Sequence, residues 1–296
     1  MKQQVLLIVN PMAGRQRIHS ELIFVVDTLT KAGYETVIYT TQSSASTRQL
    51  LKDYDSRFEK VLCCGGDGTF NEILGSTMRW KNPPVLGYIP AGTTNDFANG
   101  LGLPSDIKAA AELFVSGTPH TYDAGLFNES YFSYIASFGI FTEASYSTPQ
   151  FFKNQMGHAA YIIEGIRELT NLTSYHVRVE TNDKIYEDDY LFGAVSNAKS
   201  MGGIIKMDEE LVDLSDGLLE VMLIRMPKTL MDLSAIMTAL NTMKFDNENF
   251  VFFHTDQVLI RTDQELVWSL DGERMNGGTE CRISCIPHAF SIINAD

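Results

Sequence analysis

The first 120 residues alternate between short apolar runs and amphipathic segments, and this alternation restricts the fold more than any other feature of the chain. In residues 20–34, apolar side chains recur with the three- and four-residue spacing of one helix face, and Gly33 ends the pattern. Strands that alternate with helices in this way form a parallel sheet covered on both faces. The sequence therefore predicts an α/β domain. Its predicted strands are residues 4–10, 35–40, 60–64 and 84–90.

Beyond about residue 120, polar and apolar residues alternate with period two, which is typical of antiparallel strands. We expect a hairpin that turns near Asn128 and Glu129, and two helices at about residues 157–169 and 230–242. The chain is long enough for two domains. No low-complexity linker marks their boundary, which we place near residues 123–127.

Charge and composition exclude several classes of protein. The net charge is −14, which argues against nucleic-acid binding because such binding depends on neutralising phosphates. No apolar run is long enough to cross a bilayer, and none has the pattern of a signal peptide. The 4 cysteines form no CxxC pair, so we interpret them as buried thiols in a reducing compartment. We expect a cytoplasmic protein without a nucleic-acid partner.

Three glycine-containing loops follow predicted parallel strands, and they are the strongest functional signal. They are "NPMAGR" at residues 10–15, "GGDGTFNE" at 65–72 and "PAGTTNDF" at 90–97. The carboxyl ends of parallel strands meet at one sheet edge, where ligands bind. Glycines there let a backbone approach a ligand, and helix N-termini attract phosphate. None of the loops matches the Walker or dinucleotide-binding motif.

Carboxylates within these loops indicate a divalent cation. Asp67 stands between glycines and would be costly to bury without a partner, and Asp96 lies in the neighbouring loop. Magnesium bound together with nucleotide phosphates uses one or two carboxylates. Thr69 and Asn71 can donate hydrogen bonds to phosphate, whereas Glu72 suits the positive end of a helix.

These motifs resemble the diacylglycerol kinase catalytic domain, which is shared with sphingosine and ceramide kinases. "NPMAG", "GGDGTFNE", "GTTND" and the later "DGE" at residues 271–273 occur in that family's order. The whole chain resembles the soluble bacterial diacylglycerol kinases. The resemblance implies an α/β nucleotide-binding domain at residues 1–125 and a β-sandwich domain at 126–285, with residues 286–296 returning to the first domain. The GGDGT element also occurs in NAD kinases.

The resemblance also implies roles for individual residues. Glu273 would be the general base for a lipid hydroxyl, and Asp67, Asp96 and Asp123 would surround a catalytic magnesium ion. The residues implied to hold ATP are Asn10, Pro11, Met12, Ala13, Gly14, Thr41, Gly66, Asp67, Gly68, Thr69, Phe70, Asn71, Glu72 and Thr93.

A second, structural magnesium ion is implied in the turn "DLSDGL". It would bind the Asp216 carboxylate and backbone oxygens near Asp213 and Leu218. The residues alone favour simpler interpretations of two of these motifs: an Asp-Gly hairpin turn at Asp271, and an ordinary turn before a strand at "DLSDGL".

The resemblance therefore leads us to expect an ATP- and magnesium-dependent kinase that converts diacylglycerol to phosphatidate. The acceptor could instead be a sphingoid base, ceramide, a polyprenol or NAD, and a non-catalytic nucleotide-binding regulator ranks below these. We expect transient contact with the inner face of the membrane that holds the lipid substrate. A homodimer is compatible with the chain, although no sequence feature specifies one.

Overall fold

The computed structural model divides the chain into two compact units. Unit 1 comprises Met1–Ala124 and Ile286–Asp296, and unit 2 comprises Gly125–Cys285. The structure describes residues 3–13, 18–93, 95–140, 172–201, 205–206 and 212–295. The helix expected at residues 157–169 lies outside the described residues.

Unit 1 contains the predicted parallel sheet. Its strands run in the order β2-β1-β3-β4, each parallel to its neighbour, and the end of the C-terminal strand β17 adds alongside β4. The strands are β1 (Gln4–Val9), β2 (Glu35–Thr40), β3 (Lys60–Gly65), β4 (Val85–Pro90) and β17 (Glu280–Asn294). The α/β class predicted for the first half of the chain is confirmed.

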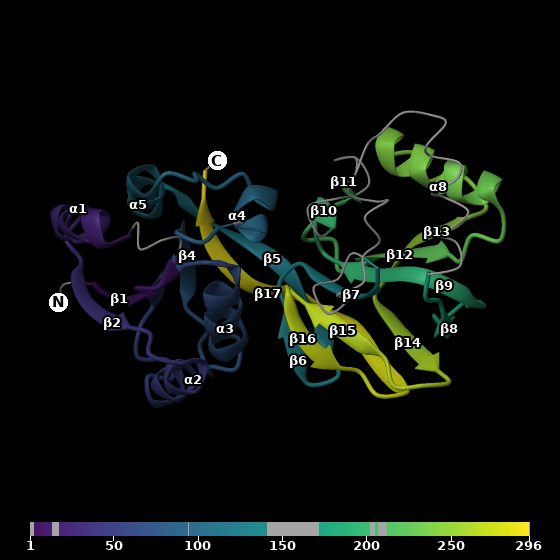
Figure 1. Cartoon of the computed structure of the whole chain (residues 1–296). Helices are drawn as coiled ribbons and strands as arrows, with labels where there is room; N and C mark the ends of the chain where they lie inside the picture. The colour runs from purple at the N-terminus through teal and green to yellow at the C-terminus, as the bar shows by residue number, and fades with distance from the viewer. Residues whose placement is uncertain are drawn as a thin grey trace. The chain divides into compact units, whose positions relative to one another are not determined.

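Helices cover both faces of this sheet (Figure 1). They are α1 (Ile18–Lys31), α2 (Ser44–Asp53), α3 (Asp67–Thr77), α4 (Asp96–Gly100) and α5 (Ile107–Ser116). Alternate side chains of β1, such as Val5 and Leu7, pack with α1 and α5, whose buried residues include Val25 and Phe114. The intervening Leu6 is equally buried. Because successive side chains of a strand point to opposite faces, Leu6 belongs to the other face of the sheet, the one covered by α2 and α3. Side chains on both faces of the sheet are therefore apolar, as a doubly covered parallel sheet requires.

Unit 2 is built from antiparallel strands. Neighbouring strands in the order β16-β15-β7-β9-β8-β14-β17 are hydrogen-bonded to each other. In addition, β12 pairs with β9, and β13 pairs with β12. One apolar core, with Trp268, Phe138, Val221 and Ile283 among its members, draws on strands from the whole length of this unit. The strands are β5 (Thr118–Phe127), β6 (Ser130–Phe132), β7 (Ile135–Gly139), β8 (Tyr175–Glu180), β9 (Ile185–Ser196), β10 (Ser200–Met201), β11 (Ile205–Lys206), β12 (Leu219–Arg225), β13 (Phe250–Thr255), β14 (Gln257–Thr262), β15 (Val267–Leu270) and β16 (Glu273–Asn276).

Two local predictions for unit 2 are confirmed. Strands β5 and β6 form a hairpin in which Phe127 pairs with Ser130, so that Asn128 and Glu129 make the turn. Helix α8 spans Leu230–Thr242, and it starts at a capping box formed by Thr229 and Asp232.

The connection between the units consists of two strands. Strand β5 begins in unit 1 and ends in unit 2, β17 runs in the opposite sense, and the two strands pair with each other. Within the described residues, no helix is both long and apolar enough to cross a membrane. All 4 cysteines are free and buried.

Two glycines in unit 1, one in a strand and one in a helix, allow a test of how tightly the core is packed. A Cβ at Gly87 in β4 would collide with the Phe114 ring, whereas a Cβ at Gly75 in α3 would meet nothing within 4 Å. We expect Gly87→Ala to lower the free energy of unfolding by ~1–3 kcal/mol because the core is overpacked. Gly75→Ala should raise it by ~0.5–1 kcal/mol because alanine favours the helix. Urea denaturation of both variants measures this, and equal effects would contradict the packing described.

Candidate functional site

Hydrogen bonds join the three predicted loops at the carboxyl edge of the parallel sheet. After β1, Asn10 donates from its backbone N–H to the Cys64 carbonyl at 2.8 Å and from Nδ2 to Thr69 Oγ1 at 2.9 Å. After β4, the N–H of Ala91 donates to the Gly65 carbonyl at 2.7 Å. The three glycine-containing loops are thus one connected structure, which we call the loop cradle.

Two glycines let the loops of the cradle touch backbone to backbone. A Cβ on Gly92 would lie 2.6 Å from the Gly66 Cα and 2.6 Å from Asn95 Oδ1. A Cβ on Gly66 would lie 3.2 Å from the Gly92 Cα. The sequence suggested that glycines here make room for a ligand. At these two positions the space is filled by the neighbouring loop.

The N-terminus of α3 faces the cradle. Its N-cap is Gly66, and no side chain caps the first turn. The first N–H groups of a helix have no partner within the helix, and the helix dipole adds positive charge there. This helix end is therefore suited to binding phosphate.

The Asp67 carboxylate ties the cradle to the next helix. It accepts hydrogen bonds from the N–H groups of Asp96 at 3.0 Å and Phe97 at 3.3 Å, both at the start of α4, and from the Tyr88 hydroxyl at 3.4 Å. Asp67 thus has partners in the protein, which the sequence did not reveal.

Charge accumulates where the cradle meets α4. Burial raises the pKa of the Asp67 carboxyl, its backbone donors lower it, and the nearby Asp96 charge raises it again. Burial also raises the pKa of Asp96. A cation beside this pair would relieve the repulsion between the two carboxylates.

A magnesium ion fits this pair only with further ligands. In the described part of the chain, no three His, Cys, Asp or Glu side chains group closely enough to hold a metal ion. Magnesium normally completes its coordination with phosphate oxygens and water. The third predicted carboxylate, Asp123, is fully buried in β5, and it accepts a hydrogen bond from the His288 N–H at 2.7 Å.

Other residues predicted to hold the nucleotide differ in their exposure. Met12 is 74% exposed, Thr93 is exposed and Thr41 is half-buried, with its N–H bonded to the Val9 carbonyl. Asn71 has a buried Oδ1 that no group among the described residues satisfies, so it could accept a hydrogen bond from a ligand or from water. Pro11 is half-buried and Ala13 is buried, and Gly14 lies outside the described residues.

Two residues predicted to bind the nucleotide have clear structural roles. The Phe70 side chain is completely buried and stacks on Tyr88 and Phe97, with ring centroids 4.6 Å apart in each pair. The Phe70 N–H is also engaged, since it donates to the Gly66 carbonyl at 3.0 Å. Glu72 forms an ion pair with Arg48 of α2 at 3.5 Å.

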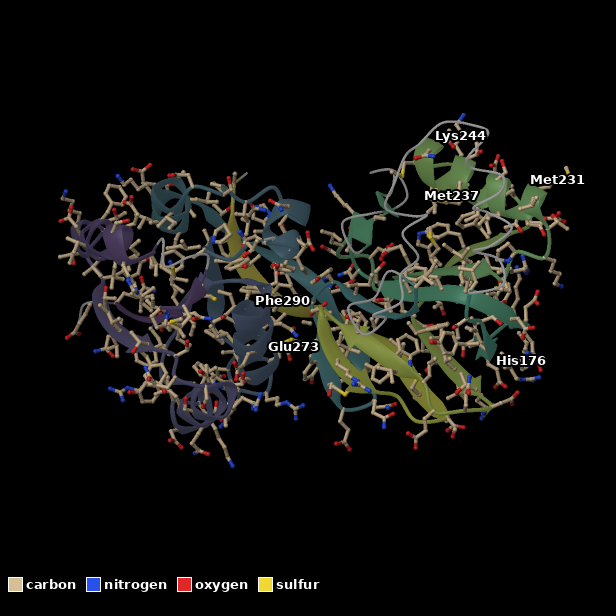
Figure 2. The ribbon with its side chains drawn as sticks, in the orientation of Figure 1. His176, Met231, Met237, Lys244, Glu273 and Phe290 are labelled. Atoms are coloured by element: carbon tan, nitrogen blue, oxygen red, sulfur yellow. The ribbon has the colours of Figure 1, made fainter. Side chains whose placement is uncertain are left out.

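Glu273 lies in unit 2 at the start of β16, and its side chain is exposed (Figure 2). Leu270 pairs with Glu273 across a two-residue turn, and both turn residues have positive φ, 47° at Asp271 and 87° at Gly272. This is the Asp-Gly hairpin turn that the residues alone suggested. The turn presents Glu273 to solvent.

The predicted structural magnesium turn is well ordered by its own side chains. Asp213 Oδ1 accepts from the Ser215 N–H at 3.0 Å, and Asp216 Oδ1 accepts from the Leu218 N–H at 2.9 Å. Glu220, two residues beyond this turn, is fully buried, and in the described structure only long contacts from the Ser196 hydroxyl and the Ala198 backbone reach its carboxylate. Burial and the Asp216 charge raise the pKa of Glu220 to about 8. The carboxylates of Asp213, Asp216 and Glu220 together concentrate negative charge here, and a bound cation would offset it.

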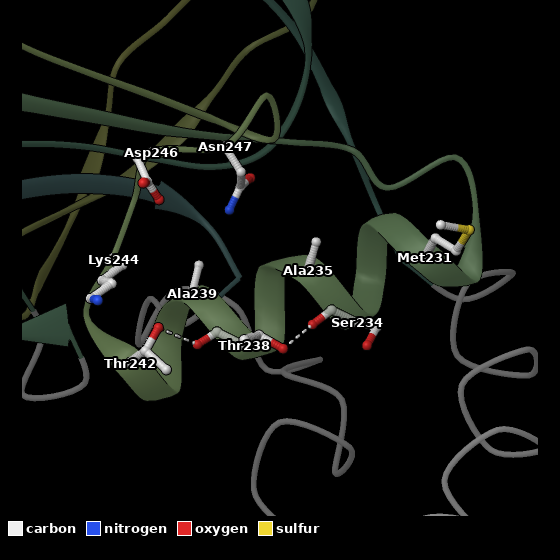
Figure 3. Close-up of a pocket in the computed structure, with 9 residues that line it drawn as sticks. All are labelled: Met231, Ser234, Ala235, Thr238, Ala239, Thr242, Lys244, Asp246 and Asn247. Atoms are coloured by element: carbon white, nitrogen blue, oxygen red, sulfur yellow. Dashed lines mark hydrogen bonds between the residues drawn. The ribbon is translucent and has the colours of Figure 1, made fainter.

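A hollow of about 580 Å³ lies elsewhere, along α8 in unit 2 (Figure 3). It extends along the helix from Met231, which is 82% exposed, to Thr242, and Lys244 lies near its other end. The Thr238 and Thr242 hydroxyls donate to carbonyls one turn earlier in the helix, at 2.8 Å each. No predicted site residue lines this hollow.

Two family models match successive parts of the chain. Residues 4–127 match the model of the diacylglycerol kinase catalytic domain. Residues 136–294 match the model of the YegS C-terminal NAD kinase beta sandwich-like domain. The β-sandwich-like class of the second half of the chain is thus confirmed.

The chain is also similar to curated enzymes along most of its length. It is 30% identical over 269 residues to the diacylglycerol kinase of Bacillus subtilis strain 168, covering 90% of this chain and 88% of that protein. It is 31% identical over 279 residues to the diacylglycerol kinase of Staphylococcus carnosus strain TM300, covering 92% and 89%.

Two solved structures from Bacillus anthracis strain Sterne have the same fold. One is 26% identical with a TM-score of 0.81, covering 99% of this chain and 97% of the other. The second, a diacylglycerol kinase, is 23% identical with a TM-score of 0.74, covering 99% and 97%.

The contact between the loops of the cradle can be tested directly. We expect Gly92→Ala to lower the free energy of unfolding by ~1–3 kcal/mol, because its Cβ must displace the Gly66 backbone or the Asn95 side chain. Gly100→Ala in α4 is the control, since a Cβ there meets nothing within 4 Å. Thermal and urea denaturation compare the two. A fully stable Gly92→Ala variant would show that the loops are not in contact.

Proposed function

Because this chain belongs to the diacylglycerol kinase family, we propose that it transfers the γ-phosphate of ATP to diacylglycerol and so forms phosphatidate, in a magnesium-dependent reaction. The protein is a lipid kinase, and its catalytic domain uses a nucleotide substrate. The observation that carries the finer proposal is the loop cradle, in which Asp67 and Asp96 meet at the N-terminus of α4 beside the uncapped end of α3.

The donor half of the reaction is supported by unit 1. Phosphoryl transfer depends on positioning and on neutralising charge rather than on covalent chemistry. The α3 N-terminus offers N–H groups to phosphate oxygens. Asp67 and Asp96 would hold magnesium, which neutralises negative charge on the phosphates. The bond from Asn10 to Thr69 fixes the first two loops around this position.

The acceptor half requires a group that takes the proton from the lipid hydroxyl. Glu273 is an exposed carboxylate on a tight turn, which suits a general base for a substrate that arrives from outside the protein. Since the acceptor is a lipid, the protein must contact a membrane surface during turnover, and we propose a transient, peripheral contact by a cytoplasmic enzyme.

Phosphorylation assays test the proposed reaction. We expect labelled phosphatidate from labelled ATP, magnesium and diacylglycerol in mixed micelles. Asp67→Asn and Glu273→Gln should each lower kcat by about 10²–10⁴-fold, because each removes a charge placed for the transfer or the proton abstraction.

Matched variants control for structural damage. Asp106 accepts from the N–H groups of Lys108 and Ala109 at the start of α5, as Asp67 does at α4, so Asp106→Asn should retain activity. Glu129→Gln, in the β5–β6 turn, serves the same purpose for Glu273. Full activity in both site variants would refute the assignment. The same assay with sphingosine, ceramide, a polyprenol or NAD as the acceptor identifies the substrate. Phosphorylation of NAD without phosphorylation of any lipid would refute the proposal and indicate an NAD kinase.

A structural cation in the turn at Asp213–Leu218 is also proposed, and it can be tested without activity. A cation that binds only the folded state raises the melting temperature. We expect magnesium to stabilise the wild type, and Asp216→Asn to lose most of this stabilisation because a charged ligand is gone.

Asp213→Asn is the matched control, since the proposed role of Asp213 uses a backbone oxygen and its side chain makes a similar turn. Scanning calorimetry with and without magnesium compares the three proteins. An unchanged magnesium response in Asp216→Asn would show that the cation does not bind there.

A further inference from the structure

A carboxylate that no proposed step uses lies two residues before Glu273. The Asp271 side chain is only 4% exposed, and it accepts four hydrogen bonds. Its Oδ2 accepts from the Ser133 N–H at 2.6 Å and from the Ser133 hydroxyl at 2.8 Å. Its Oδ1 accepts from the N–H groups of Tyr134 at 3.1 Å and Ile135 at 2.9 Å. Both oxygens are thus fully used.

These bonds connect two segments that are far apart in the sequence. Ser133 and Tyr134 join β6 to β7 and Ile135 begins β7, whereas Asp271 opens the turn between β15 and β16. The Asp271 N–H also donates to the Ile135 carbonyl at 2.9 Å. Five hydrogen bonds therefore hold the turn against the 133–135 segment.

The turn itself does not require a carboxylate. The hairpin between β5 and β6 has a comparable two-residue turn, with Asn128 at a φ of 52°. There a neutral side chain accepts one hydrogen bond, from the Arg282 N–H at 2.9 Å. Asparagine or glycine would satisfy the positive φ at Asp271 equally well. A buried charge is costly, so the carboxylate at this position has a use beyond shaping the turn.

Among the described residues, few interactions fix the position of β16, the strand that carries Glu273. Strand β16 is at the end of its sheet path and, in the part of the chain described, pairs with β15 alone. The Glu273 side chain is exposed. The backbone of Glu273 is thus held by one neighbouring strand and by the turn, and the turn is held by Asp271.

We propose that Asp271 is a positioning residue for Glu273: its carboxylate binds the N–H groups of residues 133–135 and so holds the β15–β16 turn where Glu273 can take the proton from the lipid hydroxyl. This inference rests on the proposed role of Glu273. A general base works within hydrogen-bond reach of its proton, and a displacement of ~1 Å can cost about 100-fold in rate.

Two substitutions at Asp271 preserve the turn and differ in how many bonds they keep. Asp271→Asn retains one acceptor oxygen, whereas Asp271→Gly retains none, and both residues tolerate the positive φ. We expect kcat for lipid phosphorylation to fall by about 10-fold in Asp271→Asn and by about 100-fold in Asp271→Gly. The KM for ATP should not change, because the loop cradle belongs to unit 1.

Asn128→Gly is the matched control. It removes a side-chain acceptor from a two-residue turn of the same unit without touching the β15–β16 turn. It should lower the melting temperature and leave kcat unchanged. An equal fall in kcat for Asn128→Gly and Asp271→Gly would show that a general loosening of unit 2 causes the loss, and would overturn the proposal.

A double variant separates positioning from an independent effect. If Asp271 acts through Glu273, then adding Asp271→Gly to Glu273→Gln lowers kcat little further, so the effects are strongly non-additive. Additive losses, or an unchanged kcat in Asp271→Gly, would overturn the inference. Lack of lipid kinase activity in the wild type would instead refute the proposed function, so the two failures are distinguishable.

Discussion

The loops after β3 and β4 touch at Gly66 and Gly92, and the arrangement of the candidate nucleotide site depends on that contact. With the backbones this close, the Asp67 carboxylate reaches the N–H groups at the start of α4. The same contact places the α3 N-terminus beside α4. A side chain at either glycine would separate the loops, and the carboxylates and helix ends would no longer converge.

Buried or half-buried carboxylates recur as acceptors of backbone N–H groups. Asp67 binds the start of α4, Asp123 binds His288 in the C-terminal strand, and Asp271 binds residues 133–135. Each bond offsets part of the cost of burying a charge. The acidic residues proposed for catalysis are therefore also parts of the fold, and variants at these positions need structural controls.

The residues proposed for the donor and acceptor halves of the reaction lie in different units. The loop cradle and Asp123 belong to unit 1, whereas Glu273 and Asp271 belong to unit 2. The chain passes between the units twice, through β5 and through β17. Asp123 lies in β5 two residues before unit 2 begins at Gly125, and His288 lies in β17 three residues after unit 2 ends at Cys285. Their hydrogen bond therefore connects the two strands that link the units.

Local patterns in the sequence determined much of this structure. The four parallel strands, the turn at Asn128 and the helix at 230–242 follow from apolar periodicity and turn residues, which act between neighbours along the chain. The three glycine-containing loops also lie, as predicted, at the carboxyl edge of the parallel sheet. What they did not reveal depends on distant parts of the chain: the short helix α4, the burial of Phe70 and the partners of Asp67.

Asp271 shows most clearly which features follow from the local sequence and which depend on the tertiary structure. The sequence by itself determined that Asp271 and Gly272 form a tight turn, because positive φ angles are a local requirement. Only the tertiary structure decided that the Asp271 carboxylate is buried against residues 133–135, 136 or more positions away. Hydrogen bonds to backbone N–H groups leave no pattern in side-chain identity, since nearly every residue has such a group.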